Sequence, residues 1–331
     1  MKRHEARRGL LRTFVVWLAA LSAALSATLP AAGQDWPARN ITVVVPLGAG
    51  SASDIMARVV MEQVAKQLGQ TIVIENRPGA GGTIGASAVA KAAGDGYTVL
   101  AYGALGTARA LYAKLPYDTL NDFIPVIPFG QQPLAVVASP AKYKTLKDLI
   151  AAGKANPGAL NYSTAGSGSA SHFGAERLRL SAGFEAQHIA FKGAAEAVTE
   201  LVAERVDFSV QPFTTTLSLL RDGKLVALAV SAHKRAALMP DVPTTIEAGL
   251  TADSVYPFYS GLFVPAKTPQ AVVDKLHQET AKALQIPAVR ERFAGLGIEP
   301  MPMTLAEFAA FFKNDVDGTV SLAKAAGIQP Q

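Results

Sequence analysis

The apolar positions of the chain follow two alternating periods after residue 40. A short β-branched run at 41–45 precedes a stretch of helical spacing at 55–68, and a second β-branched run follows at 71–74. This order of strand, helix and strand predicts a mainly parallel sheet covered by helices. Further strands are expected at 98–101, 134–138, 160–163, 187–191, 208–211 and 226–230. Further helices are expected at 145–154, 173–182, 194–203, 214–222, 271–284, 288–296 and 305–326, which predicts an α/β fold throughout.

Two segments rich in proline and glycine divide this pattern. They lie at 124–133 and 239–243 and bracket a block of about 105 residues that is long enough to fold as its own lobe. The chain also exceeds the roughly 250 residues at which single cores tend to divide. We therefore expect two lobes with two hinge crossings. Lobe 1 would comprise 34–133 plus 240–331, and lobe 2 would comprise 134–239.

The first 33 residues have the layout of a secretory signal peptide. A basic segment precedes an uncharged stretch at 13–29, which ends in a proline and three small residues at 30–33. The uncharged stretch is shorter than the roughly 20 residues that span a bilayer. We expect cleavage near Gly33 and a periplasmic mature chain. Sec export is favoured, although Arg7 and Arg8 also fit a twin-arginine signal.

The positive charge of the chain is concentrated in this leader. The formal net charge is +5 for the full chain and +1 after removal of residues 1–33. A near-neutral chain lacks a surface for phosphate groups, so nucleic-acid binding is not expected. The absence of cysteine excludes disulfides, thiolate metal sites, a cysteine nucleophile and a lipobox anchor. The five histidines form no paired ligand motif, and we expect no metal and no cofactor.

A four-residue string, Gly-Ser-Ala-Ser, occurs twice in the chain, at 50–53 and at 168–171. Each copy follows an expected strand and precedes an expected helix. In parallel α/β sheets such loops lie at the carboxyl edge, where ligands bind and the first N–H groups of the helix have no partner. Glycine lets the backbone approach a ligand closely, and serine adds hydroxyl donors. Two such loops from opposing lobes predict a cradle for a carboxylate.

The same residues also fit ordinary helix starts. Ser51 with Asp54, and Ser169 with His172, occupy positions where capping residues belong. Asp54 in particular fits a cap or an organiser of its loop. The repetition of the string, and the glycines beyond the needs of a cap, favour ligand binding over capping alone.

Two enzymatic alternatives arise from these loops. Gly48, Gly50 and Ser53 approximate a dinucleotide fingerprint, so a dinucleotide-binding oxidoreductase is the alternative function, but the third glycine is missing. A hydrolase would need a serine in a glycine-x-serine-x-glycine elbow, which the chain lacks. Ser171 and His172, adjacent at a helix start, are poorly placed as nucleophile and base.

Longer motifs follow one another from about Trp36 to the C-terminus. They are Trp36-Pro37, the loop Val45–Asp54, the string ENRPGAGG at Glu75–Gly82, Gly85-Ala86, Asp95–Thr98, Leu115–Asp118, Asn161-Tyr162, Gly166–His172, Lys192-Gly193, Gly223–Leu225, Pro240–Pro243 and Glu247–Gly249. Together they resemble the periplasmic solute receptors of tripartite tricarboxylate transporters, also called Bug receptors.

The resemblance implies a two-lobed Venus-flytrap fold, of the type II-like periplasmic-binding-protein kind, that closes on a small mono-, di- or tricarboxylate. It implies a receptor rather than an enzyme, with membrane transporter subunits or a sensor as partners. We expect a monomer. By position, the ligand-binding residues are Leu47, Gly48, Gly50, Ser51, Ser53, Asp54, Thr164, Gly166, Ser167, Gly168, Ser169, His172, Phe191, Gly193 and Gln211.

Several positions depart from the family pattern, which leaves the identity of the acid open. Ala49 and Ser51 replace a usual proline and glycine, Phe191 a frequent tyrosine, and Gln211-Pro212 a common Asp-Asn pair. An uncharged residue at 211 disfavours a ligand amino group. The shortened loop at 103–110 carries Arg109, either as a clamp on a second carboxylate or as a solvated side chain.

Overall fold

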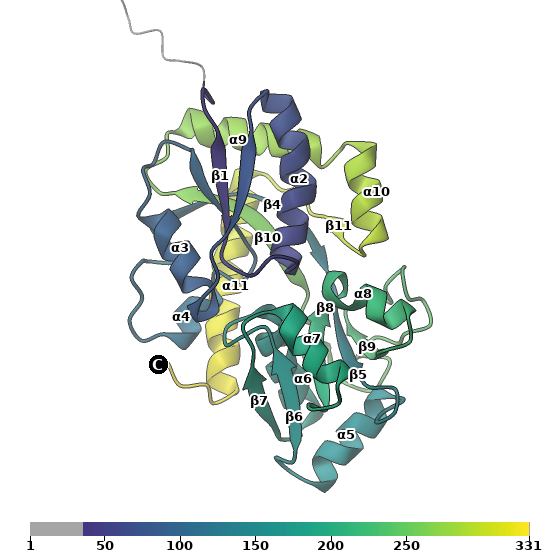
Figure 1. Ribbon diagram of the computed structural model, residues 1–331. Helices are drawn as coiled ribbons and strands as arrows, with labels where there is room; N and C mark the ends of the chain where they lie inside the picture. Colours follow the sequence, from purple (N-terminus) through teal and green to yellow (C-terminus); the bar gives the residue numbers. More distant parts are fainter. Residues whose placement is uncertain (1–35, 331) are drawn as a thin grey trace, which may run out of the picture. The chain divides into compact units, whose positions relative to one another are not determined.

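The computed structural model of the protein describes residues 36–330, and the residues from Arg39 onward form one compact unit. The expected signal peptide at 1–33 lies outside the described residues. Two sheets with interleaved helices make up this unit, as Figure 1 shows. The prediction of an α/β fold is confirmed.

The first sheet, here called sheet A, has six strands in the order β11-β4-β10-β3-β1-β2. β1 pairs in parallel with β2 and β3, whereas β10 runs antiparallel to both β3 and β4. The strands are Ile41–Val45 (β1), Ile72–Asn76 (β2), Thr98–Tyr102 (β3), Phe123–Gln132 (β4), Phe258–Pro265 (β10) and Glu299–Pro300 (β11). Buried β-branched residues dominate β1, which lies between β2 and β3 and is covered on both faces.

Strand β4 occupies the segment in which proline and glycine had predicted a boundary between lobes. Its pairing with β10 shifts register twice, at Ser260/Gly261 and at Leu262/Phe263. Pro128 and Pro125 pair with residues at these irregularities, where a strand tolerates the missing N–H of proline. The sequence pattern predicted no strand at 124–133, and β4 fills nearly all of this segment.

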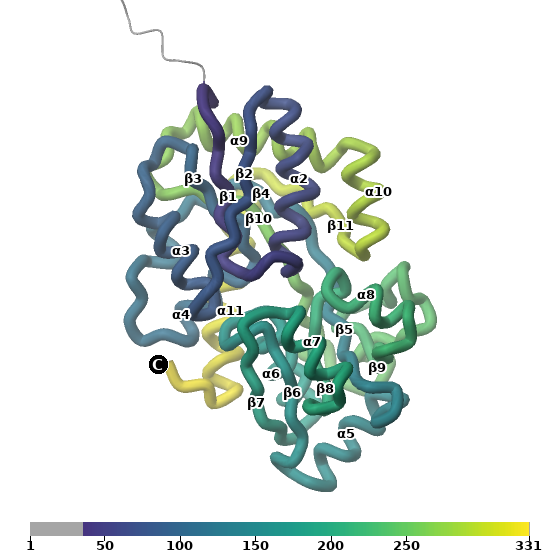
Figure 2. The backbone as a smooth tube through the Cα atoms, in the orientation of Figure 1, coloured from purple at the N-terminus to yellow at the C-terminus, as the bar shows by residue number. Residues whose placement is uncertain are grey.

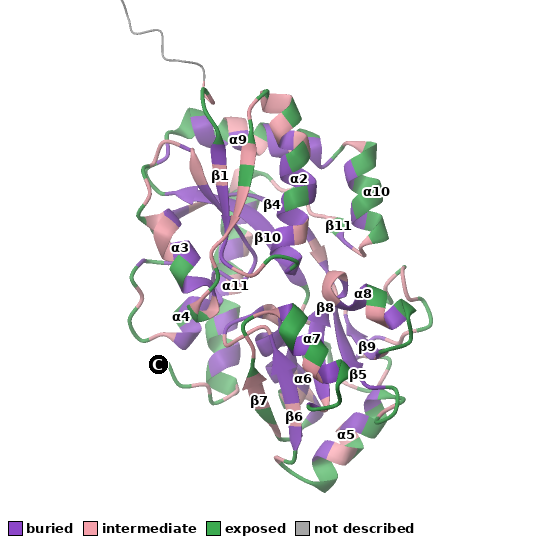
Figure 3. Cartoon of the chain, viewed as in Figure 1, coloured by how far each residue is buried: buried purple, intermediate pink, exposed green. Residues whose placement is uncertain are grey.

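Helices cover sheet A, and one continuous cluster forms the core on one face. This cluster joins Val44 and Phe263 of the strands to Ala86 of α3 and to Phe308 and Phe312 of α11. Figure 3 shows the strands mostly buried and the outer helix faces exposed. The helices associated with sheet A are Ala52–Leu68 (α2), Ala80–Gly82 (η2), Thr83–Ala90 (α3), Thr107–Leu111 (α4), Gln270–Ala283 (α9), Pro287–Gly295 (α10) and Leu305–Ala325 (α11).

The second sheet, here called sheet B, has five strands in the order β7-β6-β8-β5-β9. β6 runs parallel to β7 and β8, and β5 runs antiparallel to β8 and β9. The strands are Leu134–Ala138 (β5), Leu160–Thr164 (β6), Ala186–Ala190 (β7), Phe208–Pro212 (β8) and Val226–Ser231 (β9). The helices are Leu146–Ala155 (α5), Ala170–Ala182 (α6), Ala194–Val202 (α7), Phe213–Arg221 (α8) and Ala252–Ser254 (η3).

The chain passes between the two sheets twice, and Figure 2 traces both passages. The first lies at Pro133, between β4 and β5. Beside it, the side-chain amide of Gln132 donates to Thr214 Oγ1 at 3.2 Å and accepts the N–H of Thr214 at 3.0 Å. The second passage lies between β9 and β10. Thr244, which lies beyond the proposed boundary at 239/240, still forms a bridge with Val230 of β9. The position of this boundary stays a prediction.

Helix α11 contacts elements of both sheets. Its N-terminal part belongs to the core of sheet A, and its C-terminal residues Leu322 and Ala323 pack with Leu111 of α4 and Phe173 of α6. No helix within residues 36–330 combines the length and apolar character needed to cross a membrane.

Candidate functional site

The expected ligand-binding residues lie at the carboxyl ends of the parallel strands, in the loops that follow and in the first turns of the next helices. In sheet A these loops follow β1, β2 and β3, and in sheet B they follow β6, β7 and β8. Parallel strands deliver such loops to one edge of each sheet, which is where ligands bind in α/β proteins. The residues divide into a first loop at 47–54, a second loop at 164–172, and Phe191, Gly193 and Gln211 beside the second loop.

The first loop is organised around the carboxylate of Asp54. The N–H of Gly50 donates to Asp54 Oδ2 at 2.9 Å, and Arg58 Nε lies 3.0 and 3.1 Å from the two carboxylate oxygens. The side-chain amide of Asn76 donates both to Asp54 Oδ1 and to the carbonyl of Leu47, each at 3.0 Å. Ser51 caps α2 by accepting the N–H of Asp54. Hydrogen bonds to residues of α2 and β2 thus hold the first loop in this conformation.

These contacts keep Asp54 ionised. Burial opposes the charged form and tends to raise the pKa of Asp54, but hydrogen bonds from Arg58, the Gly50 N–H and Asn76 outweigh it and lower the pKa below its usual range. Both carboxylate oxygens already accept hydrogen bonds from the protein. The structure therefore gives Asp54 the role of loop organiser, and a direct ligand contact by this residue stays a prediction.

Replacement of Asp54 by asparagine is expected to lower the free energy of unfolding by about 1–2 kcal/mol, because one of its donors loses a charged acceptor. The measurement is chemical denaturation of the variant and the wild type at pH 7.5. Asp274→Asn is the matched control, since its carboxylate accepts from Gln270 on the exposed surface of α9. Equal losses in the two variants would contradict the organising role.

The second loop repeats the geometry of the first. Gly50 and Gly168 have φ angles of 78° and 84°. The capping serines that follow have φ/ψ of −67°/157° at Ser51 and −70°/161° at Ser169. The N–H of Gly168 donates to Nδ1 of His172 at 3.3 Å, as that of Gly50 donates to Asp54. The repeated sequence string is therefore a repeated structure, with an imidazole in place of the carboxylate.

A stack of aromatic rings supports the second loop. His172 stacks on His188 with ring centroids 4.1 Å apart, and His188 stacks on Tyr162 at 5.1 Å. Burial lowers the pKa of His172 to about 4. Burial, together with the neighbouring His172, lowers the pKa of His188 to about 4 as well. Both rings are therefore uncharged near neutral pH.

Each loop presents backbone N–H groups at the start of a long helix. Those of Ala52 and Ser53 on α2, and of Ala170 and Ser171 on α6, have no hydrogen-bond acceptor among residues 36–330. Such groups and the helix dipole favour a negative ligand. The pair of loops can thus bind an anion through two similar sets of amides.

Two expected ligand-binding residues also bury a polar atom that has no partner within the described part of the chain. These atoms are Ser53 Oγ and Gln211 Oε1, and both residues are fully buried. The orientation of the Gln211 amide follows from its neighbours: Ser209 Oγ donates to the Ser163 carbonyl and so accepts from Gln211 Nε2. Because β8 pairs with β6 at Ser209 and Ser163, Gln211 lies level with the start of the second loop.

The segment between β2 and α3 links the two loops. It is tied to the first loop through Asn76 and through the N–H of Arg77, which donates to the Val45 carbonyl at 2.9 Å. At its other end Gly81 approaches the second loop so closely that a Cβ added there would lie 2.5 Å from the carbonyl oxygen of Ser167. Sequence reasoning used this segment only as a family mark. Its three glycines in a strand-to-helix loop are the signal that identifies it.

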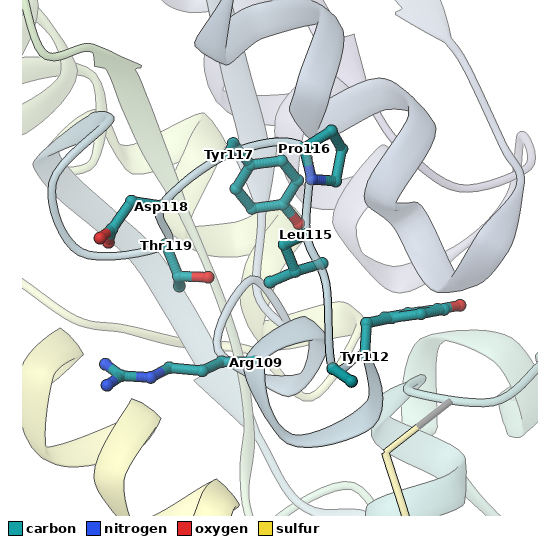
Figure 4. A pocket seen from close by; sticks show the side chains of 8 residues that line it. Arg109, Tyr112, Leu115, Pro116, Tyr117, Asp118 and Thr119 are labelled. Carbon is teal, nitrogen blue, oxygen red and sulfur yellow. The ribbon is translucent and has the colours of Figure 1, made fainter.

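Helix α4 provides a further contact to the second loop. A Cβ added to Gly168 would meet Leu111 Cδ1 at 2.6 Å and Thr107 Oγ1 at 3.3 Å. Arg109 is exposed and lines a hollow of about 620 Å³ with Tyr112, Ala113 and residues 115–119. Figure 4 shows Arg109 and Tyr112 leaving the helix in opposite directions. The exposure of Arg109 fits the solvated side chain, and its role as a clamp on a second carboxylate stays a prediction.

Comparison with known proteins identifies the family. Residues 56–328 match the family described as tripartite tricarboxylate transporter family receptor. The chain belongs to this family. The Bordetella pertussis protein BugT is 33% identical over 302 residues, which cover 90% of this chain and 92% of BugT.

Two solved structures are similar to this chain in both fold and sequence. An R. palustris protein determined with adipate has a TM-score of 0.85 and 30% identity, over 90% of this chain and 100% of that one. MatC from Rhodopseudomonas palustris with bound malate has a TM-score of 0.82 and 33% identity, over 87% of this chain and 100% of MatC.

Membership of the family decides several expectations. The resemblance to Bug receptors and the two-lobed periplasmic-binding-protein fold are confirmed. The receptors of this family bind solutes, so the chain is a solute-binding receptor and not an enzyme, and the oxidoreductase alternative is wrong. Within residues 36–330, no cluster of three or more histidine, aspartate or glutamate side chains is arranged to hold a metal ion.

Proposed function

We propose that this receptor binds a small carboxylate in the periplasm between the loops of its two lobes, and that it delivers the acid to a tripartite-type transporter or to a sensor. The observation that carries the proposal is the repeated loop geometry. Helices α2 and α6, one beside each sheet, both begin with backbone N–H groups that have no acceptor among the described residues. One carboxylate group needs several N–H donors, and two opposed sets allow the lobes to close on it.

The chemistry of the site favours a carboxylic acid without an amino group. No carboxylate of the second loop or of the β8 end is available as a partner for an ammonium ion, because position 211 is glutamine and position 172 is histidine. The buried Gln211 Oε1 is an acceptor that suits a hydroxyl group or an ordered water. The relatives determined with adipate and malate make these two acids the first to test.

Malate or adipate is expected to raise the melting temperature of the chain comprising residues 34–331. A ligand that binds only the folded state adds about 2.7 kcal/mol of stability when its concentration is 100 times its Kd. The measurement is a thermal-shift series with mono-, di- and tricarboxylates, followed by calorimetry. Dimethyl malate and dimethyl adipate are matched controls, because they have the same carbon skeletons without the charges. Stabilisation by the esters, or by nicotinamide dinucleotides and by no acid, would rule the proposal out.

A further inference from the structure

The second loop depends on an uncharged histidine. The N–H of Gly168 donates to Nδ1 of His172, so this nitrogen must carry a lone pair. In the neutral ring the proton therefore resides on Nε2. A proton added to Nδ1 would place two donors against each other and would break the contact that closes the loop.

His188 supports the opposite end of the same loop. Its Nε2 lies 2.6 Å from Thr164 Oγ1, and this oxygen accepts the N–H of Gly166 at 3.2 Å. The two stacked rings thus hold Gly166 and Gly168 on either side of Ser167, which is the residue that Gly81 contacts across the lobes. Protonation of both rings would also set two cations face to face at 4.1 Å.

The surroundings of the rings provide little compensation for a positive charge. From β6 the rings face Tyr162, and from α6 they face Glu176, whose carboxylate is already engaged by the Tyr162 hydroxyl and, at 2.9 Å, by Arg179. From α4 the residues against Gly168 are Thr107 and Leu111, neither of which titrates. The attraction of Glu176 for His188 is outweighed by burial.

We propose that His172 and His188 are positioning residues of the ligand site, that the uncharged pair assembles the second anion-binding loop, and that protonation of the pair releases it. The inference rests on the proposed function, since the loop is taken to hold the carboxylate. The first loop lacks this sensitivity because Asp54, the equivalent acceptor, stays charged in weak acid. Acid therefore disables one lobe of the site and leaves the other intact.

The test compares variants that keep or remove the acceptor. His172→Asn retains an acceptor near the position of Nδ1 and does not titrate, whereas His172→Leu removes it. Calorimetry with malate and adipate at pH 7.5 is expected to give an affinity within about threefold of wild type for His172→Asn, and at least tenfold weaker for His172→Leu. Equal affinity of His172→Leu and wild type overturns the proposal. His277→Asn is the control, because His277 contacts Met303 in the other lobe.

The pH dependence separates positioning from simple packing. The double variant His172→Asn/His188→Gln keeps acceptors or donors at both ring positions without titrating. The affinity of wild type relative to this variant is expected to fall about three- to fourfold between pH 7.5 and pH 4, because most chains then carry a proton on at least one ring. Taking the ratio cancels the titration of the acids themselves. A ratio that stays constant overturns the proposal.

A measurement without ligand distinguishes this inference from the proposed function. The amide resonance of Gly168 in a ¹⁵N-labelled chain is expected to move with the imidazole titration in wild type and to stay fixed in His172→Asn. If it does so while neither acid binds at pH 7.5, the proposed function fails and the positioning role stands. If the acids bind and the Gly168 resonance ignores the titration, the positioning role fails alone.

Discussion

Between pH 6.5 and pH 4, the free energy of unfolding of wild type is expected to fall by about 3 kcal/mol more than that of the double variant His172→Asn/His188→Gln. This figure counts the His172 ring alone. Burial lowers the pKa of His172 from its ordinary 6.5 to about 4 in the folded chain. Between these pH values the unfolded chain binds a proton at this ring and the folded chain does not. The contribution of the ring to the free energy of unfolding is therefore fully present above pH 6.5 and is lost as the pH decreases. His188 adds a loss of the same sign.

The comparison with the double variant is needed because other groups titrate in acid. Burial raises the pKa of Asp315 to about 6, so this carboxyl takes up its proton first in the folded state and opposes the histidine effect. For Glu279, burial is outweighed by hydrogen bonds from Lys282, Lys275 and Gln67, which lower its pKa to about 2, and its stabilising effect is lost only below about pH 4.5. Both groups are present in wild type and variant and cancel in the difference.

The measurement is urea denaturation of both proteins at half-unit steps from pH 7.5 to pH 4. The free energy of unfolding of wild type minus that of the double variant should be constant above pH 6.5 and should decrease steadily below it. Parallel curves over the whole range would mean that the two rings have the same pKa in the folded and in the unfolded chain. That result would also remove the physical basis for acid release of the second loop.

The sequence predicts most of the parallel part of the fold because its signals are local. Each β-branched run followed by a helical period at 41–45 and 160–163 becomes a strand and a helix within a few residues of the expected bounds. Strands β4 and β10 are different, because they pair antiparallel across more than 120 residues of intervening chain. Prolines within β4 resemble a linker locally, and only its register shifts with β10 make them compatible with a strand.

The candidate site, like the fold, is predictable from the sequence only where its signals are local. A repeated string before two helices is visible in the sequence, and its two copies adopt matching backbone angles. The partners of Asp54 and His172 are not visible, because Asn76 and His188 come from neighbouring strands. Both residues belong to the expected ligand-binding set, and Asp54 was also expected to organise its loop. In the structure each accepts the N–H of a loop glycine. Such assignments depend on which groups are buried together, and sequence spacing does not encode this.

Replacement of Gly81 by alanine is expected to weaken malate or adipate binding by roughly 5- to 150-fold, while Gly69→Ala leaves the affinity unchanged. The two glycines have φ angles of 60° and 63°, so alanine pays the same penalty of about 1–2 kcal/mol for a left-handed backbone at either position. Space around them differs. The methyl group at 69 meets nothing within 4 Å, whereas that at 81 lies 2.5 Å from the Ser167 carbonyl oxygen.

The methyl group at 81 faces a backbone oxygen, which cannot move aside as the end of a flexible side chain can. The two loops must therefore separate by several tenths of an ångström. Such overpacking costs about 1–3 kcal/mol, and a chain without ligand can avoid it by separating the two loops, whereas a chain that holds the acid between them cannot. Calorimetry gives the affinities, and thermal unfolding without ligand should show equal losses for the two variants. If Gly81→Ala binds as tightly as Gly69→Ala, closure does not bring these two loops together when the ligand is held, and the carboxylate must be bound by some other pair of surfaces.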